Sequence, residues 1–184
     1  MLISNSNDAL DGDSTRHAAT SYWTNQAFQE RYGLQREYRY IVIHHTEGAK
    51  AVDLAILTGP LSVHKYVTKN GERYHLLDDK YGAYGCGVQN PAHKTYILGE
   101  IYSRNENLAT LQIEMENFGF EEFTEPQYTA SAYWTANWCH RYDIPVSRDF
   151  ILGHNQINKQ KTDPNPTWDW ERFLRIVQVE QGKL

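Results

Sequence analysis

The sequence has little cysteine, no long apolar run and no cluster of positive charge. Its 184 residues include two cysteines, Cys86 and Cys139, and neither lies in a Cys-x-x-Cys pair. Two cysteines are too few for a disulfide framework, so we expect free thiols, as in a cytosolic protein. No apolar run approaches the roughly 18 residues of a membrane span. The N-terminus lacks the basic and apolar segments of a signal peptide, so we expect cytoplasmic synthesis and no membrane partner.

Positive charge is scarce relative to negative charge. Lys and Arg number 18 against 23 Asp and Glu, a net charge of −5, and no run of five or more basic residues occurs. The electrostatic signature of a nucleic-acid-binding protein is therefore missing. Aromatic residues reach 13% of the chain. They indicate either large core side chains or a groove that stacks on sugars or peptides, and composition favours the core.

The hydrophobic pattern alternates between strand-like and helix-like segments. β-Branched and aromatic runs predict strands over 38–43, 61–69, 73–77, 108–116 and 150–154. Helical spacing and capping signals predict helices over 14–32, 51–57, 124–142 and 168–179. The third helix has Thr124 as N-cap, Pro126 in its first turn and Gln127 at the capping-box position. These elements predict an α/β fold, a mixed central β-sheet flanked by helices, preceded by a polar tail over 1–13.

Three polar residues occupy unusual positions at the ends of the predicted strands. His44 ends the first strand, His154 follows the last one, and Asp163 lies in a loop next to Pro164. Two imidazoles and a carboxylate that converge would make a zinc site with an open fourth position, the pattern of catalytic zinc. Sequence separation does not establish proximity, and an ordinary hydrogen-bonded, half-buried histidine is the alternative for each ring.

Glu114 and Lys161 are candidates for proton transfer and charge stabilisation. Glu114 alternates with Ile113 and Met115, so it occupies the opposite face of its strand. That face is either solvated or carries a general base near a metal. Lys161 precedes Asp163 by two residues, and it is either an exposed loop lysine or a cation that stabilises an oxyanion.

Four stretches carry a family resemblance in their order and spacing. They are Ile41 to Thr46, Ser62-Val63-His64 through Asn70-Gly71, Ile113-Glu114, and Gly153-His154 through Lys161-Thr162-Asp163-Pro164. Together they resemble the zinc-dependent N-acetylmuramoyl-L-alanine amidases of the type 2 class, which share a fold with T7-type lysozymes and peptidoglycan recognition proteins. The resemblance covers residues 37–180 and leaves 1–36 as an N-terminal extension before a zinc amidase domain over 37–184.

The resemblance implies an activity and a set of site residues. The activity is hydrolysis of the amide bond between N-acetylmuramic acid and L-alanine of peptidoglycan. His44, His154 and Asp163 then bind Zn²⁺, Glu114 is the acid/base residue, and Lys161 supports the transition state. Peptidoglycan or a muropeptide is the expected partner, and the protein is expected to be a monomer.

The sequence also departs from the family pattern. Tyr84-Gly85-Cys86-Gly87 replaces a Trp-His-Ala-Gly segment whose histidine usually belongs to the substrate cleft. Asn165 replaces a glycine between two prolines, a change that a positive φ would tolerate. His45 points away from its neighbouring ligand by strand alternation, so only substrate contact remains open for it and for Tyr84. His64 matches the hairpin histidine of the family and is expected to be structural.

Three forms of this function remain open, and the favoured one is a phage-type endolysin that acts on the intact wall after release. The first alternative is a cytoplasmic amidase that recycles soluble anhydromuropeptides. The second is a peptidoglycan-binding module without catalysis, which the complete set of ligands, Glu114 and Lys161 disfavours. An unrelated α/β protein would require four accidental motif matches in the right order.

Overall fold

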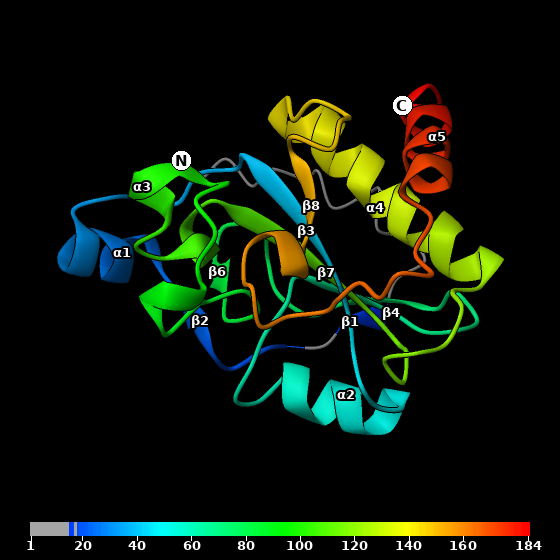
Figure 1. Ribbon diagram of the computed structural model, residues 1–184, viewed down its shortest axis with the longest axis horizontal. Coiled ribbons are helices and arrows are strands. Elements are labelled where there is room, and N and C mark those ends of the chain that lie inside the picture. The colour runs from blue at the N-terminus through cyan, green and yellow to red at the C-terminus, as the bar shows by residue number, and fades with distance from the viewer. Residues whose placement is uncertain (1–14, 17) are drawn as a thin grey trace, which may run out of the picture.

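A six-stranded mixed sheet runs through the centre of the computed structural model, which describes residues 15–16 and 18–184 (Figure 1). The strand order is β1-β5-β4-β7-β3-β8. The strands are β1 (Thr15–Arg16), β3 (Tyr40–His45), β4 (Lys65–Val67), β5 (Arg73–His75), β7 (Thr110–Met115) and β8 (Ile151–Gly153). Strand β3 runs parallel to both β7 and β8, whereas β4 and β5 form an antiparallel hairpin. A second, two-stranded sheet pairs β2 (Tyr22–Trp23) with β6 (Gly82–Ala83).

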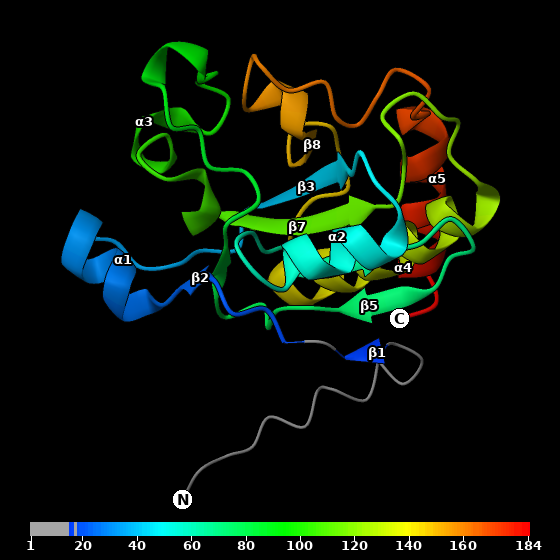
Figure 2. The same cartoon turned by 90° about the horizontal axis from the view of Figure 1, so that it is seen from below.

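Helices lie on both faces of the large sheet, which confirms the predicted fold class (Figures 1 and 2). The helices are α1 (Asn25–Tyr32), α2 (Lys50–Leu57), α3 (Gly99–Tyr102), α4 (Glu125–Tyr142) and α5 (Trp170–Gln181), with 3₁₀ turns η2 (Pro91–His93), η3 (Glu106–Leu108) and η4 (His154–Gln156). Helices α4 and α5 cover one face together, and α2 lies on the other. None of the described helices combines the length and the apolar character that crossing a membrane requires.

The start of α4 follows the capping signals of the sequence. Thr124 Oγ1 accepts a hydrogen bond from Gln127 N at 3.3 Å, and Gln127 Oε1 accepts one from Thr124 N at 3.0 Å. This reciprocal pair satisfies two backbone donors that the helix itself leaves without partners. The helix ends at Asp143, whose φ of 55° takes the chain out of the helical path.

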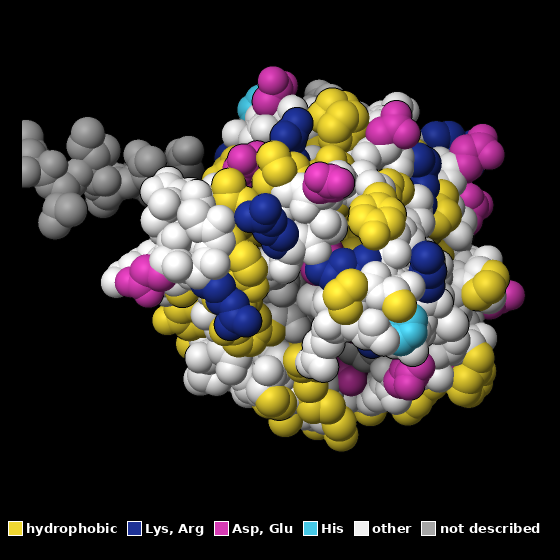
Figure 3. Space-filling model, turned by 60° about the vertical axis from the view of Figure 1, so that its left-hand side comes forward, with side chains coloured by type: hydrophobic (Ala, Val, Ile, Leu, Met, Phe, Trp, Pro, Cys, Tyr) yellow, Lys and Arg dark blue, Asp and Glu magenta, His cyan; other side chains and the backbone are white. Residues whose placement is uncertain are grey.

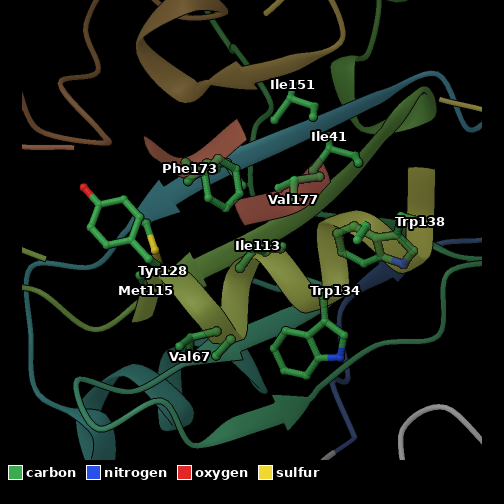
Figure 4. Close-up of a cluster of buried hydrophobic side chains, with 14 of the residues drawn as sticks. Ile41, Val67, Ile113, Met115, Tyr128, Trp134, Trp138, Ile151, Phe173 and Val177 are labelled. Carbon is green, nitrogen blue, oxygen red and sulfur yellow. The ribbon is translucent and has the colours of Figure 1, made fainter. Parts of the chain in front are cut away.

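Strand alternation divides the sheet into an apolar face and a polar face. Ile41 and Ile43 of β3 pack with Ile113 and Met115 of β7 into the core beneath α4 and α5 (Figure 4). The large aromatic side chains of α4 join the same core, and Trp134 is 2% exposed. The high aromatic content therefore serves the core rather than a groove. Both cysteines are buried and free, as predicted.

The predicted helix over 14–32 is wrong in its first part. Only Asn25–Tyr32 is helical, whereas Thr15–Arg16 and Tyr22–Trp23 are extended. Long-range pairing outweighs local helical spacing here, because Arg16 pairs with His75 of β5 and Trp23 with Gly82 of β6. The predicted tail over 1–13 lies outside the described residues.

Candidate metal centre and cleft

Three candidate ligands meet at one edge of the sheet. His44 stands near the end of β3, His154 begins η4 directly after β8, and Asp163 follows in the next loop. Because β3 and β8 are parallel neighbours, their carboxyl ends place the two histidines side by side. The two Nδ1 atoms are 3.1 Å apart, and Asp163 Oδ2 lies 3.0 Å from His44 Nδ1 and 3.1 Å from His154 Nδ1. All three residues are buried.

The protonation states of this cluster suit cation binding. Burial, and then the neighbouring His154, lower the pKa of His44 to about 4, so the ring is neutral near pH 7. Burial alone would raise the pKa of Asp163, but hydrogen bonds from His154 and His44 outweigh it and hold that pKa well below its ordinary value. The cluster therefore combines an ionised carboxylate with neutral nitrogen, which is the state metal ligands require.

The spacing of the donor atoms fits a small divalent cation. Zinc–ligand bonds of roughly 2.0–2.2 Å in a tetrahedron set donor–donor distances of about 3.3 to 3.6 Å. The three distances in the cluster are 3.0 to 3.1 Å, a little short of these values. A slight outward movement of the side chains would accommodate the ion, and a set of two imidazoles and one carboxylate is typical of catalytic zinc.

Glu114 lies beside the cluster on the polar face of the sheet. It is in register with His44 across β3 and β7, and its Oε2 lies 3.9 Å from His44 Nδ1. Burial raises the pKa of Glu114 well above its ordinary value, and the charges of Asp163 and Asp53 add to the effect. The side chain is 13% exposed, so the solvated-face interpretation does not describe it. A largely buried carboxyl with a raised pKa next to a candidate metal site can both accept and donate a proton.

A cleft of about 410 Å³ opens in front of these residues. One wall is polar and comes from the loop that carries Gln160, Lys161 and Thr162. The opposite wall is apolar and comes from α2 and the turn after it, where Val52 and Leu61 are exposed. Figure 3 shows hydrophobic side chains along the lower part of the molecule, with a hollow in the surface above them. No Phe, Tyr or Trp is among the described residues that line the cleft.

The loop that carries Asp163, here called the ligand loop, is held by hydrogen bonds on both sides of that residue. Asn155 N donates to Asp163 O at 3.0 Å, and Lys161 N donates to Asn158 O at 3.0 Å. Lys161 itself is exposed and lines the cleft, so its cation stands at the mouth of the site. Asn165 does not have a positive φ, since Asp143 alone does among the described non-glycine residues. Its Nδ2 instead donates to Glu121 O at 3.1 Å, which ties the loop to the end of β7.

The remaining candidates divide between cleft and scaffold. His45 lines the cleft, lies outside the metal group, and stacks its ring on Phe123 with centroids 6.1 Å apart. Tyr84 packs edge-on against Trp23 with centroids 5.7 Å apart and is not among the lining residues. The two ring nitrogens of the buried His64 face the backbone groups Tyr81 O and Gln112 N.

Gly85 is closely surrounded by neighbouring side chains. Gly85 lines the cleft, but a Cβ there would lie 2.0 Å from Gln112 Oε1 and 2.9 Å from Val63 Cγ1. A side chain at this position would therefore require Gln112 and Val63 to move. The cleft is therefore bare backbone at this position.

Asp53 is a cleft residue that sequence reasoning missed. Its carboxylate is buried, lines the cleft, and accepts hydrogen bonds from Thr46 Oγ1 at 2.9 Å and Tyr66 Oη at 2.8 Å. Burial raises the pKa of Asp53 above its ordinary value. The sequence signal was an acidic residue in the first turn of a helix, which is too common a feature to indicate a site.

Comparison with known proteins places these features in one family. Residues 34–166 match the family described as N-acetylmuramoyl-L-alanine amidase. A curated relative, the 1,6-anhydro-N-acetylmuramyl-L-alanine amidase AmpD of Salmonella typhimurium, is 29% identical over 126 residues, which is 67% of this chain and 60% of the relative. The chain thus matches about three-fifths of the length of that relative.

Solved structures agree on the fold. A crystal structure of an AmpD derivative aligns with a TM-score of 0.65 at 21% identity and covers 90% of this chain and 95% of that one. An endolysin N-acetylmuramoyl-L-alanine amidase from Clostridium intestinale aligns with a TM-score of 0.58 at 17% identity, covering 89% of this chain and 95% of that one. The chain therefore shares its fold with AmpD and with a Clostridium endolysin.

Proposed function

The chain belongs to the N-acetylmuramoyl-L-alanine amidase family, and we propose that it hydrolyses the amide bond between N-acetylmuramic acid and L-alanine, with zinc as cofactor. The observation that carries this proposal is the convergence of His44, His154 and Asp163 beside Glu114 in one cleft. The family match begins at residue 34, and the division into an extension over 1–36 and a domain over 37–184 stays a prediction.

His44, His154 and Asp163 would hold the ion. When bound, zinc supplies Lewis acidity, which polarises the substrate carbonyl and acidifies a water molecule. The buried neutral imidazole of His44 and the ionised Asp163 are already in the protonation states that binding needs near pH 7. Little proton rearrangement therefore accompanies metal binding at these two residues.

Glu114 and Lys161 would carry the rest of the reaction. Glu114 takes a proton from the attacking water and returns one to the leaving alanine nitrogen, since its carboxyl lies 3.9 Å from the ligand His44 and has a raised pKa. Lys161 lines the cleft from the ligand loop and stabilises the negative charge that develops on the substrate oxygen. Together with the three ligands, these two residues favour catalysis over a binding module.

The form of the substrate distinguishes two versions of this activity. We propose intact peptidoglycan, as for an endolysin, and the fold shared with the Clostridium endolysin is compatible with it. The second candidate is a soluble 1,6-anhydromuropeptide, which the name of the Salmonella relative supports.

Product analysis tests the proposal. The zinc-loaded protein is incubated with purified peptidoglycan and, separately, with soluble anhydromuropeptide, each with and without EDTA. New alanine amino termini that disappear with EDTA, without new reducing sugar ends, are expected. Reducing ends would indicate a glycosidase, and no product from either substrate would contradict the amidase proposal.

A further inference from the structure

A rigid loop beside the cleft presents an exposed aromatic ring. The loop follows β7 and contains Phe120, which is 80% exposed. Phe118 of the same loop forms a bridge with Glu47, and Glu47 lines the cleft. The loop that carries the ring is therefore joined to a residue of the cleft, and the ring itself lies outside the core.

Internal hydrogen bonds fix this loop. Asn117 Oδ1 accepts from Gly119 N at 2.8 Å and from Glu121 N at 3.3 Å, and Asn117 Nδ2 donates to Glu121 O at 3.1 Å. Gly119 has a φ of 86°, which a side chain would strain. Glu121 also forms an ion pair with Lys69 at 2.6 Å. Phe120 is thus held out on an ordered support, where binding it costs little conformational entropy.

The ligand loop is joined to the same support. Asn165 Nδ2 and Thr167 Oγ1 both donate to Glu121 O at 3.1 Å. Asp163 precedes these residues by a short stretch, and Lys161 lies on the other side of it. Along the chain, Asp163 therefore lies between an end of the loop that carries Lys161 and an end that is bonded to the Phe120 loop.

Charge differs between these two ends. Lys159 and Lys161 are exposed at one end, whereas Glu47 and Glu122 are exposed near Phe120, where Lys69 is paired with Glu121. The stem peptide of peptidoglycan carries carboxylates, which the basic end attracts and the acidic end repels. N-Acetylated sugars of the glycan strand are neutral, present apolar C–H faces to an aromatic ring, and offer hydroxyl donors to carboxylates.

We propose that the Phe120 loop is a glycan subsite, which binds a sugar of the strand adjoining the muramoyl residue that is cleaved. This inference rests on the proposed amidase function and specifies its substrate as a glycan-bearing one. Stacking on one aromatic ring contributes a modest part of the binding free energy, so its loss lowers kcat/KM by roughly two- to tenfold.

The first test of the subsite compares one Phe120 variant on two substrates of different size. Phe120→Ala is assayed on a muramoyl peptide without further sugars and on one that carries adjoining N-acetylglucosamine. The subsite predicts a selective loss of kcat/KM on the larger substrate. Tyr96→Ala is the matched control, since Tyr96 is likewise an exposed aromatic residue, at 74%, and belongs to a different segment of the chain. Equal effects on both substrates would overturn the proposal.

A binding measurement separates this inference from the amidase proposal. The indole of Phe120→Trp is titrated with N-acetylglucosamine oligomers and, separately, with free stem peptide, and Tyr96→Trp serves as the control. A saturable fluorescence change with the oligomers alone supports the glycan subsite even where amidase activity is missing. No response to the oligomers, or a response to the stem peptide instead, overturns the subsite while leaving amidase activity to its own test.

Discussion

Two buried groups of residues in this protein use histidine ring nitrogens in opposite ways. The scaffold cluster is His64 with Arg36, and the site cluster is His44 with His154 and Asp163. His64 accepts a hydrogen bond at Nδ1 from Gln112 N at 3.0 Å, and its Nε2 faces Tyr81 O at 3.0 Å. In the other cluster the Nδ1 atoms of His44 and His154 converge on Asp163, and both Nε2 atoms are buried without a partner. A ring with both nitrogens paired belongs to the scaffold, whereas rings that converge on one carboxylate form a site that a cation can complete.

The two clusters also differ in where their positive charge comes from. Arg36 brings its own cation to the scaffold cluster and donates to three carbonyl oxygens, Asp79 O at 2.7 Å, Asn107 O at 2.8 Å and Thr110 O at 2.9 Å. Burial lowers the pKa of Arg36 to about 10, so it stays charged near pH 7. The metal centre has the carboxylate of Asp163 but no buried side-chain cation among the described residues that form it.

Replacing the carboxyl group of Glu114, beside the site cluster, should have the largest effect on the amidase rate. Glu114→Gln keeps the shape of the side chain but cannot accept or donate the proton, so the amidase rate should fall by roughly 10²- to 10⁴-fold. Zinc content should stay unchanged, because Glu114 is not one of the ligands. Alanine release and metal analysis on the same sample check both halves, and full turnover would exclude this role for Glu114.

Replacing Arg36 should have the largest effect on the scaffold cluster. Arg36→Met leaves three buried carbonyl oxygens without donors and should lower the free energy of unfolding by about 3 kcal/mol or more. Zinc stoichiometry in the folded fraction should not change. Urea denaturation measures the difference, with the exposed Arg39→Met as control. Equal stability of the two variants would contradict the scaffold role.

Lys161 tests whether charge at the cleft mouth matters for the reaction. Lys161→Met should lower kcat by about 100-fold, because the oxyanion loses a stabilising cation. Its stability should be unchanged, since the side chain is exposed. Lys159→Met is the control two residues away, and its kcat should match the wild type. Equal losses in both variants would point to a general charge effect instead.

Acidification should weaken the scaffold cluster. Burial, and then the charge of Arg36, lowers the pKa of His64 well below 6.5. Because folding lowers the pKa of this base, its contribution to stability is fully present above about pH 6.5. As pH falls towards the folded-state pKa the unfolded chain binds a proton first, and the contribution is lost. The loss is at most about 1.4 kcal/mol per pH unit.

The His64 contribution can be isolated by a variant. Urea denaturation of the metal-free wild type and of His64→Gln is compared over the range from about pH 7 to pH 5. The variant should show a shallower decline, because its amide does not titrate. Identical slopes would show that His64 does not contribute to the pH dependence.

Much of the metal centre could be predicted from the sequence. His44 and His154 each end a strand, and parallel neighbouring strands bring such ends together. Strand alternation also placed Glu114 on the face away from Ile113, where it is in register with His44. The local pattern left open whether these residues lie close together, and the family resemblance supplied the set of His44, His154 and Asp163.

Other features depend on partners that local patterns do not contain. The strand Tyr22–Trp23 exists because it pairs with Gly82–Ala83, some sixty residues later. The carboxylate of Asp53 is held in the cleft wall by hydrogen bonds from Thr46, directly after β3, and from Tyr66 of β4. The near neighbour of Gly85 is Gln112, which only the folded chain brings close.

Zinc content is the most direct test of the contrast between the two clusters. Wild-type protein, Asp163→Ala and His64→Gln are stripped with chelator, reloaded with zinc, dialysed and analysed for metal. The account predicts one zinc per chain in the wild type and in His64→Gln, and almost none in Asp163→Ala. Unchanged zinc in Asp163→Ala would contradict it.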